Sequence, residues 1–183
     1  MDKSVSEVPR DLPKKMHARR LTFYHPNTKG AGAAVQFELR LNREGEERYD
    51  CFFLEMAHQK PVEEGDLRSR GPASFDWGKK ITVKLDFLDV CELLLVLEGR
   101  KEQAGDGRNG IYHAANGANT LISLKKSSEG GGCYLGLSRK AQDGSQLFRG
   151  NLLLSEAECV GLRCVFQSGL FIMTFGSSGV PPI

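Results

Sequence analysis

The sequence lacks an uninterrupted apolar run of the roughly 18 residues that a membrane-spanning helix requires. Its first twenty residues are polar and contain no apolar centre of the kind found in secretory signals. There is a single tryptophan, and the formal net charge is only +2. Overall charge therefore neither favours nor excludes a nucleic-acid partner, and we expect no contact with a membrane.

Motifs of the common enzyme classes are also missing. There is no Gly-x-Ser-x-Gly, no His-Glu-x-x-His, no phosphate-binding Gly-x-x-x-x-Gly-Lys-Ser/Thr and no dinucleotide fingerprint. The histidines, at positions 17, 25, 58 and 113, lack the spacing of metal ligands. Cys51 or Cys133 could in principle pair with a histidine as a nucleophile, but no local signature supports this. We expect no catalysis, no cofactor and no metal.

The five cysteines, at positions 51, 91, 133, 159 and 164, are odd in number and include no Cys-x-x-Cys. Each lies within an apolar strand or helix pattern, so we interpret them as reduced core residues of a cytosolic protein. The tail at 1–20 is mildly basic, but its acidic residues argue against an organelle transit peptide. We expect a bacterial cytoplasmic protein, either free or associated with the nucleoid.

The most informative stretch is 73–99. Residues 81–86 alternate apolar and polar side chains, which predicts a half-buried strand. Residues 87–99 are almost apolar throughout and predict a helix, with Asp86 placed to cap it and Gly99 to end it. A helix that is apolar on every side cannot face water. It must pack on its own sheet and on something else.

The same order of elements occurs twice in the chain. In each half, four strand patterns precede a helix, and the second helix begins at the capping box Ser155-x-x-Glu158. This predicts a tandem ββββα repeat of the α+β class; the alternative is an ordinary mixed α+β domain with chance matches. The predicted organisation is a flexible basic tail at 1–20, a first repeat at 21–99, a linker at 100–110, a second repeat at 111–176 and a tail at 177–183, all in one integrated domain. The predicted strands are 21–25, 33–41, 49–58, 81–86, 111–114, 119–126, 133–140 and 147–154.

Three segments carry a resemblance to a known family. Residues 29–35 read Lys-Gly-Ala-Gly-Ala-Ala-Val, and residues 75–80 read Phe-Asp-Trp-Gly-Lys-Lys. The strand at 111–113 and the strand at 121–126 follow in the expected order. Together they resemble the Whirly single-stranded-DNA-binding proteins over residues 21–176. The first segment departs from the family motif by one inserted residue and by lacking a second lysine.

The resemblance implies a fold and a function. Two antiparallel four-stranded sheets would pack roughly orthogonally, and the helices would meet at the centre of a homotetramer. The chain would bind single-stranded DNA with little sequence preference, in genome maintenance or transcription regulation. The alternatives are an RNA-binding protein of the same fold, or a protein-interaction or structural module without nucleic-acid affinity. The expected oligomer interface comprises Val90, Leu94, Leu97, Leu162, Val165 and Phe166.

The candidate nucleic-acid-binding residues are basic or aromatic side chains, with one glutamine on a polar strand face. Cations hold phosphates, and each base stacked on an aromatic ring contributes about 1–3 kcal/mol. Every candidate has a plainer alternative: a solvated lysine, a core tyrosine, a tryptophan that plugs a turn, or a solvated hairpin. The set is Tyr24, His25, Lys29, Gln36, Arg40, Trp77, Lys79, Lys80, Tyr112, His113, Lys125, Arg139, Phe148 and Arg149.

Overall fold

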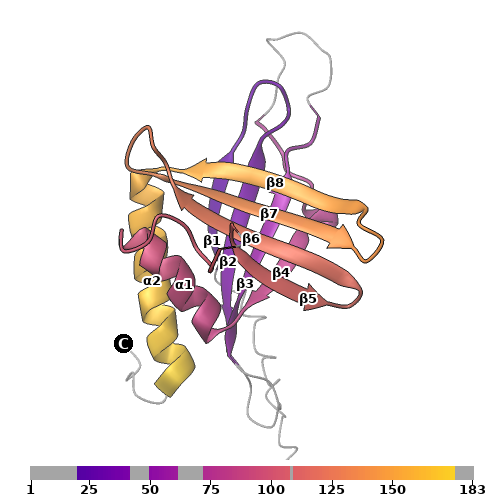
Figure 1. Cartoon of the computed structure of the whole chain (residues 1–183). Coiled ribbons are helices and arrows are strands. Elements are labelled where there is room, and N and C mark those ends of the chain that lie inside the picture. Colours follow the sequence, from indigo (N-terminus) through magenta and orange to yellow (C-terminus); the bar gives the residue numbers. More distant parts are fainter. Residues whose placement is uncertain (1–19, 42–49, 62–71, 108, 176–183) are drawn as a thin grey trace, which may run out of the picture.

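Each half of the chain forms a four-stranded antiparallel meander followed by a helix (Figure 1). The computed structural model describes residues 20–41, 50–61, 72–107 and 109–175. The tandem ββββα prediction is confirmed; the two predicted tails lie outside these residues, apart from Arg20. The elements are β1 (Arg20–His25), β2 (Ala33–Arg40), β3 (Cys51–His58), η1 (Trp77–Lys79), β4 (Ile81–Leu85), α1 (Phe87–Leu97), β5 (Ile111–Ala115), β6 (Ala118–Lys126), β7 (Cys133–Ala141), β8 (Gln146–Leu154) and α2 (Glu156–Phe175).

Both helices begin at the predicted capping residues. At α1, the Asp89 N–H donates to Asp86 Oδ1 and the Asp86 N–H donates to Asp89 Oδ2, each at 2.9 Å. At α2, the Ser155 N–H donates to Glu158 Oε2 at 2.7 Å, and the Glu158 N–H donates back to Ser155 Oγ at 3.3 Å. Each capping box satisfies backbone N–H groups that the first helical turn cannot pair.

The two sheets share one hydrophobic core. Figure 1 shows the strands of the second sheet (β5–β8) running across those of the first sheet (β1–β4). Helix α2, which ends the second repeat, packs on the first sheet: the Phe166 ring meets Phe37 and Phe52 edge-on, with centroids 5.4 and 5.2 Å apart. Gly169 on the same helix lies directly against the Phe52 ring. The repeats are therefore packed into one another.

The predicted linker at 100–110 is not a free connection. The Ala104 N–H donates to the Leu124 carbonyl, and the Lys126 N–H donates to the Glu102 carbonyl, each at 2.9 Å. Residues 102–104 thus lie along β6 beyond the end of β5, and Ala104 is fully buried. This segment extends the second sheet and helps to close the core.

Four of the predicted oligomer-interface residues are part of this intramolecular core. Val90, Leu94, Leu162 and Phe166 are all less than a tenth exposed in a single chain. Leu97 and Val165 are half-buried and pack against the same core. The expectation that another chain covers Val90, Leu94, Leu162 and Phe166 was wrong, because the helices and sheets of one chain already bury them. For Leu97 and Val165 it stays a prediction.

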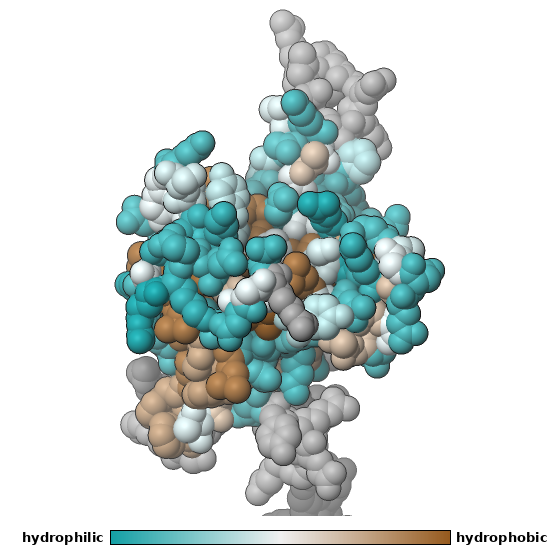
Figure 2. All heavy atoms as spheres, viewed as in Figure 1, coloured by the Kyte–Doolittle hydropathy of each residue, from teal (hydrophilic) through white to brown (hydrophobic). Residues whose placement is uncertain are grey.

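A different apolar surface remains open on the helices. Val160, Cys164, Phe171 and Phe175 are exposed on α2, and their spacing places them along one stripe of the helix. Leu88 on α1 is 71% exposed. Figure 2 shows an apolar patch over the helices on one side of the molecule. In the following text, these four α2 residues are called the α2 stripe.

Within the described residues, α2 is also the one helix long and apolar enough to cross a membrane, judged by length and composition alone. No such helix was predicted from the sequence because only uninterrupted apolar runs were counted, and Arg163 and Gln167 interrupt the apolar residues of α2. A core helix passes the same test, and α2 places Leu162 and Phe166 in the core of the chain.

Three of the five cysteines are buried as predicted: Cys51, Cys133 and Cys159. Cys91 is half-buried, and burial raises its pKa as it does that of Cys51. Cys164 is exposed on the α2 stripe, so its assignment to the core was wrong. Helical periodicity turns it away from the buried side of α2, on which Leu162 and Phe166 lie.

Candidate nucleic-acid interface

The outer face of the second sheet collects side chains that alternate with its core residues. The strand register arranges these side chains in rows that run across the sheet. Neighbouring rows are about 7 Å apart along the strands, and neighbouring strands are about 5 Å apart. The first row holds Lys125, Tyr134 and Leu153; the second Ser123, Gly136 and Asn151; the third Tyr112, Leu121, Ser138 and Arg149; the fourth Ala114, Asn119, Lys140 and Gln146.

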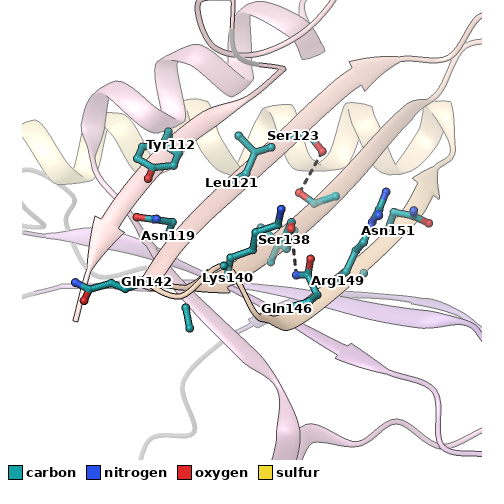
Figure 3. Close-up of a pocket in the computed structure, with 15 residues that line it drawn as sticks. Tyr112, Asn119, Leu121, Ser123, Ser138, Lys140, Gln142, Gln146, Arg149 and Asn151 are labelled. Atoms are coloured by element: carbon teal, nitrogen blue, oxygen red, sulfur yellow. Dashed lines mark hydrogen bonds between the residues drawn. The ribbon is translucent and has the colours of Figure 1, made fainter. Parts of the chain in front are cut away.

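This face is hollowed. One hollow of about 640 Å³ lies over the second to fourth rows (Figure 3). A second, of about 540 Å³, lies over the first and second rows. Tyr134 in the first row and Tyr112 in the third row are both 46% exposed. Exposed tyrosine rings beside a long shallow hollow offer the flat apolar faces on which bases stack.

Three exposed cations lie on the same face: Lys125, Lys140 and Arg149. None of the three makes an ion pair or side-chain hydrogen bond with another described residue. Among the described residues, no aspartate or glutamate lines either hollow. Asp143, in the hairpin that follows β7, accepts from the Ser145 N–H at 2.8 Å, and hydrogen bonds from the Ser145 side chain and backbone lower its pKa. The face is therefore positively charged, and its cations are available to phosphates.

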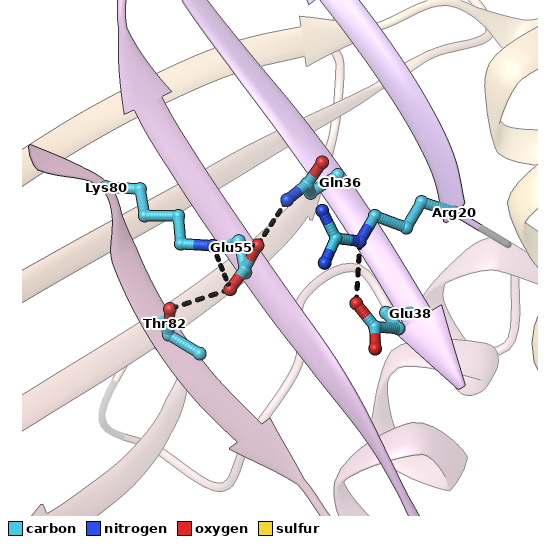
Figure 4. A network of polar contacts seen from close by, with 6 residues as sticks. All are labelled: Arg20, Gln36, Glu38, Glu55, Lys80 and Thr82. Carbon is cyan, nitrogen blue, oxygen red and sulfur yellow. Dashed lines mark hydrogen bonds and ion pairs between the residues drawn. The ribbon is translucent and has the colours of Figure 1, made fainter. Parts of the chain in front are cut away.

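The outer face of the first sheet is different, because Glu38 and Glu55 lie on it and pair with Arg20 and Lys80 (Figure 4). Glu55 on β3 accepts from Lys80 Nζ at 2.7 Å and from Thr82 Oγ1 at 2.9 Å. Gln36 Nε2 donates to the same carboxylate. Burial would raise the pKa of Glu55, but these three hydrogen bonds and the Lys80 charge outweigh it and hold the pKa below its ordinary value.

A second ion pair lies on the same face, between Arg20 Nε and Glu38 Oε2 at 2.6 Å. The guanidinium of Arg40 lies 5.1 Å from the centre of the Phe53 ring. Of the predicted binding residues, Gln36 and Lys80 are therefore held in the Glu55 network, and Arg40 covers a neighbouring ring. The first sheet presents a largely neutralised surface.

The three predicted binding residues that flank the hairpin at 143–144 divide between the two faces of the second sheet. Arg149 points outward and lines the larger hollow (Figure 3). Arg139 points inward, donating to Thr120 Oγ1 at 2.8 Å and to the Thr82 carbonyl at 2.9 Å, so it ties the two sheets together. Phe148 also points inward and stacks on His58, with ring centroids 4.5 Å apart. Arg139 and Phe148 do not belong to the outer face.

The paired histidines have structural partners as well. His25 Nε2 lies 3.0 Å from Glu158 Oε1, and His113 Nε2 lies 3.0 Å from Asp89 Oδ2. Burial would raise the pKa of Glu158, but hydrogen bonds from Ser155 and His25 hold it below its ordinary value. Both histidines are thus engaged at helix N-termini, away from the hollowed face.

The remaining candidates surround the first sheet. Trp77 is half-buried and packs with Phe75 over two small core alanines, which favours its interpretation as a plug. The exposed Tyr24 ring lies 5.5 Å from Phe75. Lys79 and Lys29 are exposed; Lys79 Nζ lies 3.9 Å from Asp76 Oδ2, and Lys29 occupies a turn held by Asn27. Of the fourteen predicted residues, only Tyr112, Lys125 and Arg149 line the hollows.

The sequence prediction missed several residues of this face, chiefly Tyr134, Lys140, Asn119 and Asn151. Strand alternation contained the signal for the first two. In the sequence, the apolar Cys133, Leu135 and Leu137 recur at every second residue, which assigns 134 and 140 to the opposite face of the strand. No sequence pattern indicated that the asparagines of β6 and β8 would share a surface, because that depends on register across three strands. Among the described residues, no three His, Cys, Asp or Glu side chains converge as a metal site.

Two crossed meanders, each closed by a helix, define a class of fold seen in solved structures, although no protein-family model and no curated protein matches the sequence. WHY1 from Arabidopsis thaliana superimposes with a TM-score of 0.64 at 17% identity, over 91% of this chain and 89% of that one. The plant transcriptional regulator PBF-2 superimposes with a TM-score of 0.54 at 18% identity, over 88% of this chain and 84% of that one. A guide-RNA-binding protein complex bound to a guide RNA superimposes with a TM-score of 0.57 at 15% identity, over 87% of this chain and 94% of that one. The fold is Whirly-like, as the sequence resemblance implied.

Proposed function

We propose that the chain is a non-catalytic protein that binds single-stranded nucleic acid, DNA in the first instance, with low sequence preference. The observation that carries the proposal is the outer face of the second sheet. Its three cations, which form an ion pair with no described residue, can hold phosphates, and its tyrosines can stack bases. No carboxylate of the described residues lines its hollows to repel a polyanion. The guide-RNA complex with the same fold supports a nucleic-acid partner.

The test is a titration with single-stranded oligonucleotides of about 12 nucleotides at several salt concentrations. Binding should weaken as salt rises, because phosphate contacts release counterions. Lys125→Ala, Lys140→Ala and Arg149→Ala should each lower the slope of log K against log salt by about 0.7. Lys84→Ala is the matched control, since Lys84 is an exposed lysine on β4 of the first sheet. Salt-independent binding, or equal loss in the control, would contradict the proposal.

RNA is the main alternative ligand, and the guide-RNA complex is the observation that favours it. Stacking and phosphate contacts serve both polymers, and only contacts to the 2′-hydroxyl distinguish them. Parallel titrations with DNA and RNA of one sequence would decide. We also propose that the protein acts in transcription or genome maintenance, in a bacterial cytoplasm. The likeness to a plant transcriptional regulator supports the role in transcription.

The proposal includes self-association. The α2 stripe exposes Val160, Phe171 and Phe175, with the last two rings 5.1 Å apart. Apolar side chains at this spacing suit packing against the same helix of a second copy around a symmetry axis. A homotetramer joined through the α2 stripe replaces the interface first expected through Val90 and Leu94, which are buried. The mass in solution, measured by light scattering, tests it.

A further inference from the structure

The two hollows of the second sheet meet at one row. Ser123, Gly136 and Asn151 line both of them, together with Leu121. Gly136 lies at the centre of this row and has no side chain, so the surface dips there, and the Ser123 hydroxyl lies over the dip, 2.6 Å from where a Cβ at 136 would be. The row is about 10 Å wide, because it crosses three strands. We call it the Gly136 slot.

The slot is neutral, with hydrogen-bonding groups at both ends. The Asn151 carboxamide bonds to no other described residue. The Ser123 hydroxyl makes only a long bond of 3.4 Å to the Gly136 carbonyl. The Tyr134 side chain bounds the slot on one side and Leu121 bounds it on the other. These groups suit a flat, uncharged heterocycle with donors and acceptors on its edge. They do not suit a phosphate, which requires a cation or converging N–H groups.

The cations are placed on either side of the slot. Lys125 belongs to the row before it and Arg149 to the row after it, each about 7 Å away along the strands. They lie on β6 and β8, so a line from one to the other crosses the slot diagonally. A single strand that follows this line would bring a phosphate to each cation and a base to the slot between them.

From this arrangement we infer that the Gly136 slot takes one nucleobase of the bound strand, laid against Tyr134 with its edge at Asn151. The bases of the strand therefore face the sheet at this point, and its phosphates lie to either side. The inference rests on the proposed function and adds to it the orientation of the strand. Stacking is tolerant of base identity, so a base slot is compatible with low sequence preference.

The test fills the slot without touching a cation. A Cβ at position 136 would lie 2.6 Å from Ser123 Oγ, so Gly136→Val is made in a Ser123→Ala background. Valine favours strands, and position 136 is on an outer face, so the fold should tolerate it. The control, Ala114→Val in the same background, puts the same valine side chain on the same face, with two added carbons instead of three, at a residue that lines neither hollow. Each protein is titrated with a normal oligonucleotide and with an abasic one of equal length.

The expected result is a loss of about tenfold for the normal strand with Gly136→Val, the size of one stacked base, and no loss for the abasic strand. The control should match its background on both. Equal affinity of the Gly136 and control variants for the normal strand would overturn the inference, and so would an equal loss on both strands. If the wild-type protein binds neither the normal nor the abasic strand, the proposed function is wrong as well.

A second measurement does not depend on the variant folding. The wild-type protein is irradiated with oligonucleotides that carry a halogenated uracil, and the cross-linked peptide is identified by mass spectrometry. Cross-links at Tyr134 or Leu121 are expected. Cross-links confined to other surfaces, with binding intact, would overturn the base slot while leaving the proposed function standing.

Discussion

His113 of the second repeat binds Asp89 of the first, with Nε2 3.0 Å from Oδ2. Asp89 is also the third residue of helix α1, and its carboxylate completes the capping box of that helix. The relation is reciprocal: His25 of the first repeat binds Glu158, the capping-box acid of α2, at 3.0 Å. Each helix therefore begins at a carboxylate that the first strand of the other repeat also holds.

Removal of either histidine should loosen the joint between the repeats. His113→Ala is expected to lower the free energy of unfolding by about 1–3 kcal/mol, because a nearly buried carboxylate loses a partner. Denaturant unfolding measures this. A double-mutant cycle with Asp89→Asn should show that the two changes are not additive. If the two changes in the free energy of unfolding were strictly additive, the contact between His113 and Asp89 would contribute nothing to stability.

Acid should destabilise the fold through Glu55 and Glu158. Both pKa values are lowered in the folded chain from 4.5, so both carboxylates stabilise it at neutral pH. That contribution is present above the unfolded pKa and is lost as pH falls through the lower, folded values. The free energy of unfolding, followed from about pH 7 to about pH 3, should decline below the unfolded value. Glu55→Gln should flatten the decline, whereas Glu129→Gln, at an exposed turn, should leave it unchanged.

Two glycines of α2 should respond to alanine in opposite directions. At Gly169 a Cβ would lie 2.2 Å from the Phe52 ring, so Gly169→Ala overpacks the core at a cost of about 1–3 kcal/mol. At Gly161 a Cβ would meet nothing within 4 Å, and Gly161→Ala should gain up to about 1 kcal/mol from helix propensity. Thermal unfolding compares them. If both variants were stabilised, the close approach of α2 to the first sheet would be wrong.

Charges on the helices should separate folding from association. Leu94→Glu places a charge in the core and should cost more than the about 2–5 kcal/mol of a buried leucine truncation. Phe171→Glu, on the exposed α2 stripe, should change stability by only about 0.5 kcal/mol. It should nevertheless reduce the mass measured by light scattering. If the wild-type protein self-associates and Phe171→Glu has the same mass, the contact between copies does not involve the α2 stripe.

The strand and helix order was predictable because local patterns set it: alternation on β2, β6 and β7, and the capping residues Asp86 and Ser155. What the patterns could not show was which apolar side chains the chain itself would bury. The apolar pattern at 87–99 predicted contact with a second copy, yet α2 and both sheets cover Val90 and Leu94. Packing of each helix against distant strands is a property of the tertiary fold, and composition does not encode it.

The candidate site shows the same limit. Tyr112, Lys125 and Arg149 were identified as exposed basic or aromatic residues of the second repeat, and they line the hollows. Residues with the same character, such as Lys80 and Arg139, were assigned to the site as well. Their partners, the Glu55 carboxylate and the Thr82 carbonyl, are brought to them only by folding. Whether a cation is available to a ligand depends on whether the chain already neutralises it.

The contrast between the two outer faces bears on how such a duplicated protein evolves. In the first sheet, Glu55 and Glu38 hold Lys80 and Arg20, so substitutions there would be constrained by stability. In the second sheet, Lys140 and Arg149 stabilise nothing by pairing, and the row at Gly136 is left open. Mutations on that face are free to alter ligand preference at little risk to the fold. Substitutions on the outer face of the first repeat would therefore cost stability, and the second repeat is where new specificity would arise most readily.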